Sequence, residues 1–264
     1  MIRFFILLIF FACLNILVAQ NEVECNNSRI DFGNKEILNY KVSYNFGIIW
    51  IDAGFVDFMA TKQTLNGYET YQFTSTGISE KKWEWIYKVR DTFQVISNAK
   101  NLYPIEFRRS TLEGGIYNMD QYSFDNDKNV VYAKMRDNNS EYKFDSISIS
   151  DCTYDILTAT YVARSMDFSN NWVGDTIMIK LIHDGRLFKL PIVYHGKEIM
   201  EGMNNSPVIC TKFSAIIDKG TMFRSGEKIT IWVTDDKYKI PVLIDAKIVV
   251  GSIKVYLINK NIGD

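Results

Sequence analysis

Residue types that carry catalytic or metal-binding chemistry are scarce in this chain. Its 264 residues include two histidines, four cysteines and four prolines, and no two cysteines lie close enough for a zinc site. The sequence also lacks a Gly-x-Ser-x-Gly elbow, a His-Glu-x-x-His motif, a phosphate-binding loop and a dinucleotide fingerprint. We therefore assign no catalytic residue, predict neither a metal nor a cofactor, and do not favour an enzyme.

Strong net charge and long apolar runs are absent as well. Lys+Arg number 30 and Asp+Glu number 31, with no basic block or stripe, so we expect no nucleic-acid partner. Beyond residue 19 no apolar stretch is long enough to cross a membrane, and we expect no transmembrane span in the mature chain.

The first 19 residues have the pattern of a secretory signal peptide. Met1-Ile2-Arg3 is a short basic start, and the apolar run from Phe4 continues to Ala19, after which we expect cleavage. The rival interpretation is a lipoprotein signal that is cut and lipidated at Cys13, although Phe10 suits that motif poorly. The predicted location is the periplasm or another exported site, with a lipid anchor through Cys13 as the alternative.

Strand patterns fill most of what remains. Apolar and polar residues alternate in short stretches bounded by turn signals such as Asn66-Gly67 and Gly114-Gly115, as in an antiparallel sheet. One helix is expected at 151–167, capped by Ser150 or Asp151. The sequence therefore predicts one β-rich domain over 20–264. We expect a single strongly curved antiparallel sheet or half-barrel, with this principal helix on its concave side.

Several short motifs follow one another along the chain in a characteristic order. They include Leu38-Asn-Tyr-Lys-Val-Ser-Tyr, Tyr87-Lys-Val-Arg-Asp-Thr-Phe, Cys152-Thr-Tyr-Asp-Ile-Leu-Thr-Ala-Thr-Tyr-Val-Ala-Arg and Ile231-Trp-Val-Thr-Asp-Asp. In this order they resemble the exported bacterial family called domain of unknown function 3108. The resemblance implies a β-rich envelope protein and carries over no activity. By fold analogy, periplasmic lipoprotein carriers wrap such a curved sheet around a helix and an apolar cavity.

The cysteines of the mature chain predict one disulfide. Disulfides persist in exported proteins, and a Cys25–Cys152 bond would join the segment before the first strand to the start of the helix. Cys210 lies in an alternating strand and is expected to remain a buried thiol.

Three functions stay open at this point. The first is non-catalytic binding of an apolar, lipid-like envelope molecule, in a cavity lined by Trp85, Tyr87, Arg90, Tyr161 and Arg164. The second is an assembly or structural protein without a cavity, whose exposed apolar surface meets an envelope protein partner. The third is an envelope hydrolase, which would show clustered acids of shifted pKa. If aromatic side chains fill the space between helix and sheet, the second function replaces the first.

Overall fold

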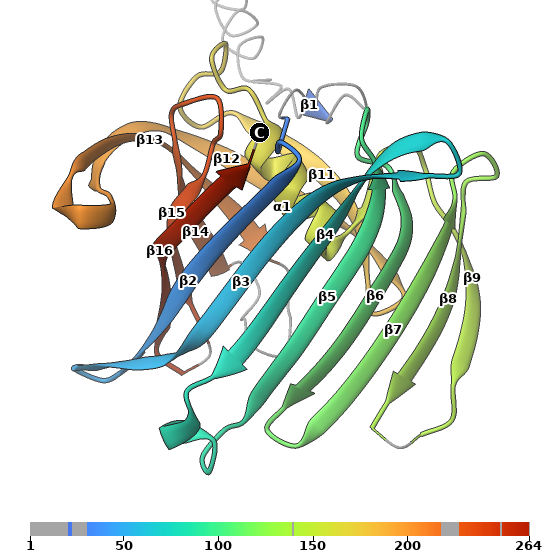
Figure 1. Cartoon of the computed structure of the whole chain (residues 1–264), viewed down its shortest axis with the longest axis horizontal. Coiled ribbons are helices and arrows are strands. Elements are labelled where there is room, and N and C mark those ends of the chain that lie inside the picture. Colours follow the sequence, from blue (N-terminus) through green and yellow to red (C-terminus); the bar gives the residue numbers. More distant parts are fainter. Residues whose placement is uncertain (1–20, 23–30, 139, 218–226, 249, 264) are drawn as a thin grey trace, which may run out of the picture.

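The computed structural model describes residues 21–22, 31–138, 140–217, 227–248 and 250–263, and strands make up most of them (Figure 1). Two short 3₁₀ helices, η1 (Lys81–Trp83) and η2 (Met203–Asn205), and one α-helix, α1 (Ile156–Ser165), interrupt the strands of this described part. The strands are β1 (Asn21–Glu22), β2 (Lys35–Phe46), β3 (Ile49–Leu65), β4 (Tyr68–Ser79), β5 (Val89–Asn98), β6 (Pro104–Glu113), β7 (Ile116–Asp125), β8 (Val130–Asp137), β9 (Lys143–Ser148), β10 (Thr153–Asp155), β11 (Thr176–His183), β12 (Arg186–Glu201), β13 (Pro207–Ile217), β14 (Glu227–Thr234), β15 (Pro241–Lys247) and β16 (Ser252–Gly263).

All described strands belong to one sheet in the order β1-β11-β12-β13-β14-β15-β16-β2-β3-β4-β5-β6-β7-β8-β9, with β10 beside β11. Neighbours are antiparallel except for the short β1 and β10, which pair with β11 in parallel. No pairing within the described part joins β9 to the β11 end, so the sheet curves round without closing. The predicted half-barrel is confirmed.

Alternation along the strands explains which side of the sheet is buried. In β4, Tyr71, Phe73 and Ser75 are buried on the concave side, and the residues between them are less buried. The predicted turn at Asn66-Gly67 joins β3 to β4, and both residues have positive φ, of 51° and 83°. Asn and Gly tolerate this left-handed backbone, which two-residue hairpins require.

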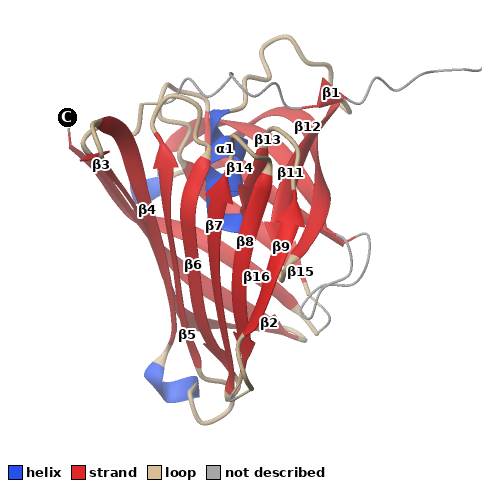
Figure 2. Cartoon of the chain, turned by 90° about the vertical axis from the view of Figure 1, so that its right-hand side faces the viewer, coloured by secondary structure: helices blue, strands red, loops and turns tan. Residues whose placement is uncertain are grey.

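The helix lies on the concave side, as predicted, but it is shorter than the expected 151–167 span (Figures 1 and 2). Residues Thr153–Asp155 pair with β11 as β10, so the chain is still extended where the helix was expected to begin. The cap is Asp155 and not Ser150 or Asp151: its Oδ1 accepts hydrogen bonds from the backbone N–H groups of Leu157 and Thr158, both at 2.9 Å. These contacts fix where α1 starts, over β4, β5 and β11.

Candidate functional site

The five predicted ligand-binding residues fall into two separate groups. Trp85 and Tyr87 follow η1 at the lower end of the molecule in Figures 1 and 2, where 81% and 48% of their surface is exposed. Arg90 is the second residue of β5 and forms an ion pair with Glu84. Tyr161 and Arg164 lie on α1 in the upper half and are only 1% and 4% exposed.

The distance along β5 shows how far apart the two groups are. Ser97 of β5 contacts Thr158 of α1, with 3.2 Å between their hydroxyl oxygens. Arg90 precedes Ser97 by seven residues, or roughly 23 Å of strand. The structure therefore does not bring the five residues together in one ligand site.

Aromatic side chains fill the space between α1 and the sheet. The ring of Tyr161 stacks on Phe73 of β4, with 3.8 Å between centroids and 19° between planes. Phe32 packs edge-on against both, at centroid distances of 5.1 Å to Tyr161 and 5.5 Å to Phe73. The Tyr161 hydroxyl is buried and has no hydrogen-bond partner among the described residues. Tyr161 is thus a core residue that closes the region where a carrier would need a cavity.

The guanidinium group of Arg164 donates its hydrogen bonds to other residues of the protein. Its Nη1 and Nη2 donate to the two carboxylate oxygens of Glu36 at 2.8 and 2.9 Å. Nε and Nη2 also donate to the backbone carbonyls of Lys239 and Tyr238, both at 3.1 Å. This bidentate pair holds the end of α1 against β2 and the β14–β15 turn, so Arg164 has a structural role.

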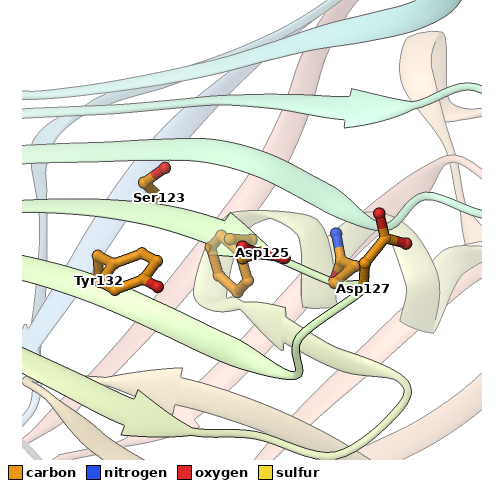
Figure 3. A pocket seen from close by; sticks show the side chains of 6 residues that line it. Ser123, Asp125, Asp127 and Tyr132 are labelled. Carbon is orange, nitrogen blue, oxygen red and sulfur yellow. The ribbon is translucent and has the colours of Figure 1, made fainter.

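A surface hollow of about 420 Å³ lies elsewhere, at the β7–β8 turn (Figure 3). None of the five predicted residues lines it; its walls are Ser123, Phe124, Asp125, Asn126, Asp127 and Tyr132. Lys128 donates to Asp125 from its side chain at 2.8 Å and from its backbone at 3.0 Å, and these bonds lower the pKa of that carboxyl. This polar hollow is formed by one turn and does not match the apolar cavity that a lipid would need.

A group of ionisable side chains, here called the concave cluster, was missed by sequence reasoning. Its members are Asp91, Arg109, Glu113, Asp120, His183 and Asp184. Arg109 is at its centre: Nη2 lies 2.7 Å from Asp120 and 2.6 Å from Asp184, and Nη1 lies 3.4 Å from the His183 ring nitrogens. The register of β6 and β7 places Arg109 opposite Asp120, and the β11–β12 hairpin brings in His183 and Asp184.

Burial shifts several pKa values in this cluster. The pKa of Asp91 rises to about 7, first because of burial and then because of the neighbouring Glu113 charge and the hydrogen bond between the two carboxyls. Burial also raises the pKa of Asp120, against the opposing effect of Arg109, and lowers that of His183. The cluster joins three strands and a distant hairpin, so no linear motif could have revealed it. In the described residues, no three His, Cys, Asp or Glu side chains are grouped so that they could hold a metal ion.

Large apolar side chains are exposed together at three adjoining turns, which we call the lower rim. These are the β2–β3, β4–β5 and β15–β16 turns, with Ile48, Ile49, Trp50, Trp85, Ile86 and Val250. Trp83 Nε1 donates to the Asp52 carbonyl at 3.0 Å, and the Tyr44 hydroxyl donates to the Val250 carbonyl at 2.9 Å. These bonds link the three turns, so the exposed residues lie together at the same end of the sheet.

The structure tests only some of the predictions about the cysteines and the membrane. Residues 1–20 and Cys25 lie outside the described residues, so the signal peptide, the Cys13 alternative and the Cys25–Cys152 disulfide stay predictions. Cys152 is buried directly before β10, and Cys210 is a free buried thiol, as expected. Within the described chain, no helix has the length and apolar character needed to cross a bilayer.

Comparison with known proteins agrees with the fold. A beta-barrel-like protein of domain of unknown function DUF1849 from Brucella abortus matches with TM-score 0.57 and 8% identity, over 87% of this chain and 98% of its own. A hypothetical protein from Chlamydia trachomatis matches 85% of this chain and 86% of its own at 9% identity, with a TM-score of 0.35 that is too low to indicate a shared fold. No curated protein matches. The family model described as "Protein of unknown function (DUF3108)" matches residues 39–258. Because that match covers most of the chain, the protein belongs to the DUF3108 family, as the order of its motifs predicted.

Proposed function

We propose that this protein is a non-catalytic component of the bacterial envelope that works by docking its lower rim onto another envelope component. One observation carries the proposal: large apolar side chains are exposed together on the rim, while the space between α1 and the sheet is filled. Ile48 is 97% exposed and Trp85 is 81% exposed. Contiguous exposed apolar surface commonly marks a site of interaction.

The alternative of a lipid carrier loses its support from the same structure. A carrier needs a cavity of at least roughly 300 Å³ that covers most of the ligand. Phe32, Phe73 and Tyr161 occupy the region where that cavity was predicted. The residues expected to line it also lie at two different places, so we no longer favour the carrier function.

An envelope hydrolase has one feature in its favour, the raised pKa of Asp91 in the concave cluster. The carboxylates there are already engaged by the protein. Asp120 and Asp184 bind Arg109, and Asp91 shares a hydrogen bond with Glu113 and accepts one from the Leu112 N–H at 3.3 Å. This arrangement suits a structural connection between strands better than a cleft that takes substrate.

The proposal can be tested by fractionating cells that express the full chain. In the variant Trp85→Ser/Ile86→Ser, we expect the protein to leave the sedimented envelope fraction, because the rim has lost two exposed apolar anchors. The matched control is Trp172→Ser/Val173→Ser, which removes side chains of similar exposure (79% and 70%) in the loop before β11, away from the rim. The control should sediment like the wild type. The proposal would be rejected if both variants sedimented to the same extent, or if the wild type did not sediment with the envelope fraction.

A further inference from the structure

We infer that the envelope component bound by the lower rim is the surface of an anionic phospholipid bilayer. This inference rests on the proposed function and adds the chemistry of the partner. It follows from three properties of the rim: apolar groups on protruding tips, lysines around them that have no acidic partner in the described chain, and turns that are hydrogen-bonded to one another.

The apolar groups project from turns and do not lie flat on a sheet face. Figure 1 shows the β2–β3 turn and the η1 segment extending from the lower end of the sheet. Ile48 and Ile49 occupy the first, and Trp85 and Ile86 follow η1 in the second. Narrow tips of this kind can enter the boundary between lipid headgroups and acyl chains. Tryptophan suits that depth because it combines a large apolar ring with an N–H donor.

The charge around these tips is positive. Lys81, Lys82, Lys88 and Lys247 are exposed, and no carboxylate of the described chain lies within 4 Å of their amino groups. Acids of the same region are paired: Glu84 with Arg90, Asp52 with Lys41 at 3.3 Å, and Asp245 with Lys254 at 3.7 Å. Glu80 remains as a half-buried acid. Asp91 and Glu113, near Tyr87, face the concave side and share a hydrogen bond.

This positive rim contrasts with the whole chain, whose formal net charge is −1. Lysines beside an apolar surface attract anionic lipid headgroups and keep their own apolar stems against the membrane boundary. The charge therefore favours an anionic bilayer over an uncharged apolar partner.

Hydrogen bonds tie the described residues of the rim to one another. Besides the Trp83 and Tyr44 bonds, the Glu80 N–H donates to the Ala53 carbonyl at 2.8 Å, which fixes the β4–β5 connection to β3. Gly251 has φ of +87°, and a Cβ there would lie 2.0 Å from the Asn45 carbonyl oxygen, so only glycine allows this approach of β15–β16 to β2–β3. Tips that are tied to one another lose less conformational entropy on binding a surface than free loops would.

The test is flotation of the purified mature chain with vesicles of phosphatidylcholine alone and of phosphatidylcholine with phosphatidylglycerol. We expect the chain to float with the anionic vesicles and to detach as salt is raised, because salt screens the lysine attraction. Trp85→Ser/Ile86→Ser should weaken partitioning by about tenfold or more. Lys81→Gln/Lys82→Gln should bring binding to anionic vesicles down toward the level seen with neutral ones. Trp172→Ser/Val173→Ser should behave like the wild type.

Three results would overturn the inference. The wild type could fail to bind anionic vesicles, bind both lipid compositions equally, or keep its binding in the Trp85→Ser/Ile86→Ser variant. The wild type could bind no vesicles while the Trp85→Ser/Ile86→Ser variant is still lost from the envelope fraction in cells. In that case the rim docks to an envelope protein, and only the proposed function survives. If neither effect is seen, both proposals fail.

Discussion

Asp91 lies where its carboxyl group keeps a proton in conditions under which an exposed aspartate would lose it. The side chain faces the concave side of β5, near Glu113 and Arg109. Burial and the Glu113 carboxyl raise the pKa of Asp91 from an ordinary 3.8 to about 7, and the Leu112 N–H and Arg109 oppose the rise. The folded chain therefore holds a proton that the unfolded chain releases near pH 4.

This proton predicts a pH dependence of stability. Between about pH 4 and 7 the folded state binds more protons at Asp91 than the unfolded state, so its contribution to stability falls as pH rises through this window. The asparagine side chain in Asp91→Asn cannot ionise, so this variant should not lose stability through position 91 as the pH rises. We expect the variant to gain a few degrees in melting temperature relative to the wild type at pH 8 and little at pH 4.

Thermal unfolding followed by circular dichroism at both pH values measures this difference. The exposed Asp127 at the β7–β8 turn gives the control, since Asp127→Asn should not change the pH dependence of unfolding. If the difference in melting temperature between Asp91→Asn and the wild type is the same at pH 4 and pH 8, the carboxyl of Asp91 ionises normally in the folded chain.

At the scale of elements, α1 contributes buried side chains to the filled interior of the sheet. Four of its apolar side chains are buried against the concave side: Leu157, Ala159, Tyr161 and Val162. The helix is held at its start by the Asp155 cap and at its end by the Glu36–Arg164 pair, so its register against β4 and β5 is fixed from both ends. Tyr161 is the largest side chain of α1 among those that are almost fully buried.

Two substitutions of Tyr161 separate packing from polarity. Tyr161→Ala removes the ring stacked on Phe73 and should lower the free energy of unfolding by about 3–5 kcal/mol, in line with losses of large core aromatics. Tyr161→Phe keeps the ring and removes a hydroxyl that is buried without a partner in the described part of the chain, so it should be neutral or stabilising. Urea unfolding of the three proteins measures both effects. A Phe variant as unstable as the Ala variant would show that the hydroxyl has a partner, which would reopen the question of a bound molecule.

The elements themselves were largely predictable from sequence, because strand alternation and turn residues act locally. Asn66-Gly67 marked the β3–β4 turn, and Gly114-Gly115 marked the β6–β7 turn. The start of α1 was missed because three residues, 153–155, pair with β11, which is a long-range effect that local capping signals cannot show. Arg109 and Asp184 were missed for the same reason: 75 positions separate them in the chain, and only the curvature of the sheet brings them together.

At the scale of the whole molecule, the opening of the half-barrel is bridged from inside. The sheet order ends at β9 on one side and at β11 with β1 on the other. The tip of the β11–β12 hairpin reaches across to β6 and β7, where the Gly185 N–H donates to the Tyr122 hydroxyl at 3.0 Å and Asp184 binds Arg109 at 2.6 Å. The concave cluster thus connects parts of the sheet that share no strand pairing, and it should keep the open sheet from spreading.

Arg109→Met tests this connection. The substitution leaves Asp120, whose side chain is only 3% exposed, without its counter-ion, and a broken buried pair of this kind lowers the free energy of unfolding by about 3–5 kcal/mol. Because an unpaired buried carboxylate can take up a proton, the deficit should be smaller at acidic pH than at pH 8. Hydrogen exchange should also speed up in β11 and β12 more than in β2 and β3.

The neighbouring residue supplies the control for this experiment. Arg108 points to the convex side, is 63% exposed and lies 3.4 Å from the exposed Glu106, so Arg108→Met should change stability by no more than about 0.5 kcal/mol. Equal losses in the two variants would mean that removing a positive charge, and not opening the bridge, destabilises the chain. Uniform acceleration of exchange across the whole sheet in Arg109→Met would show that the half-barrel opens as one cooperative unit, and the hairpin would then have no separate closing role.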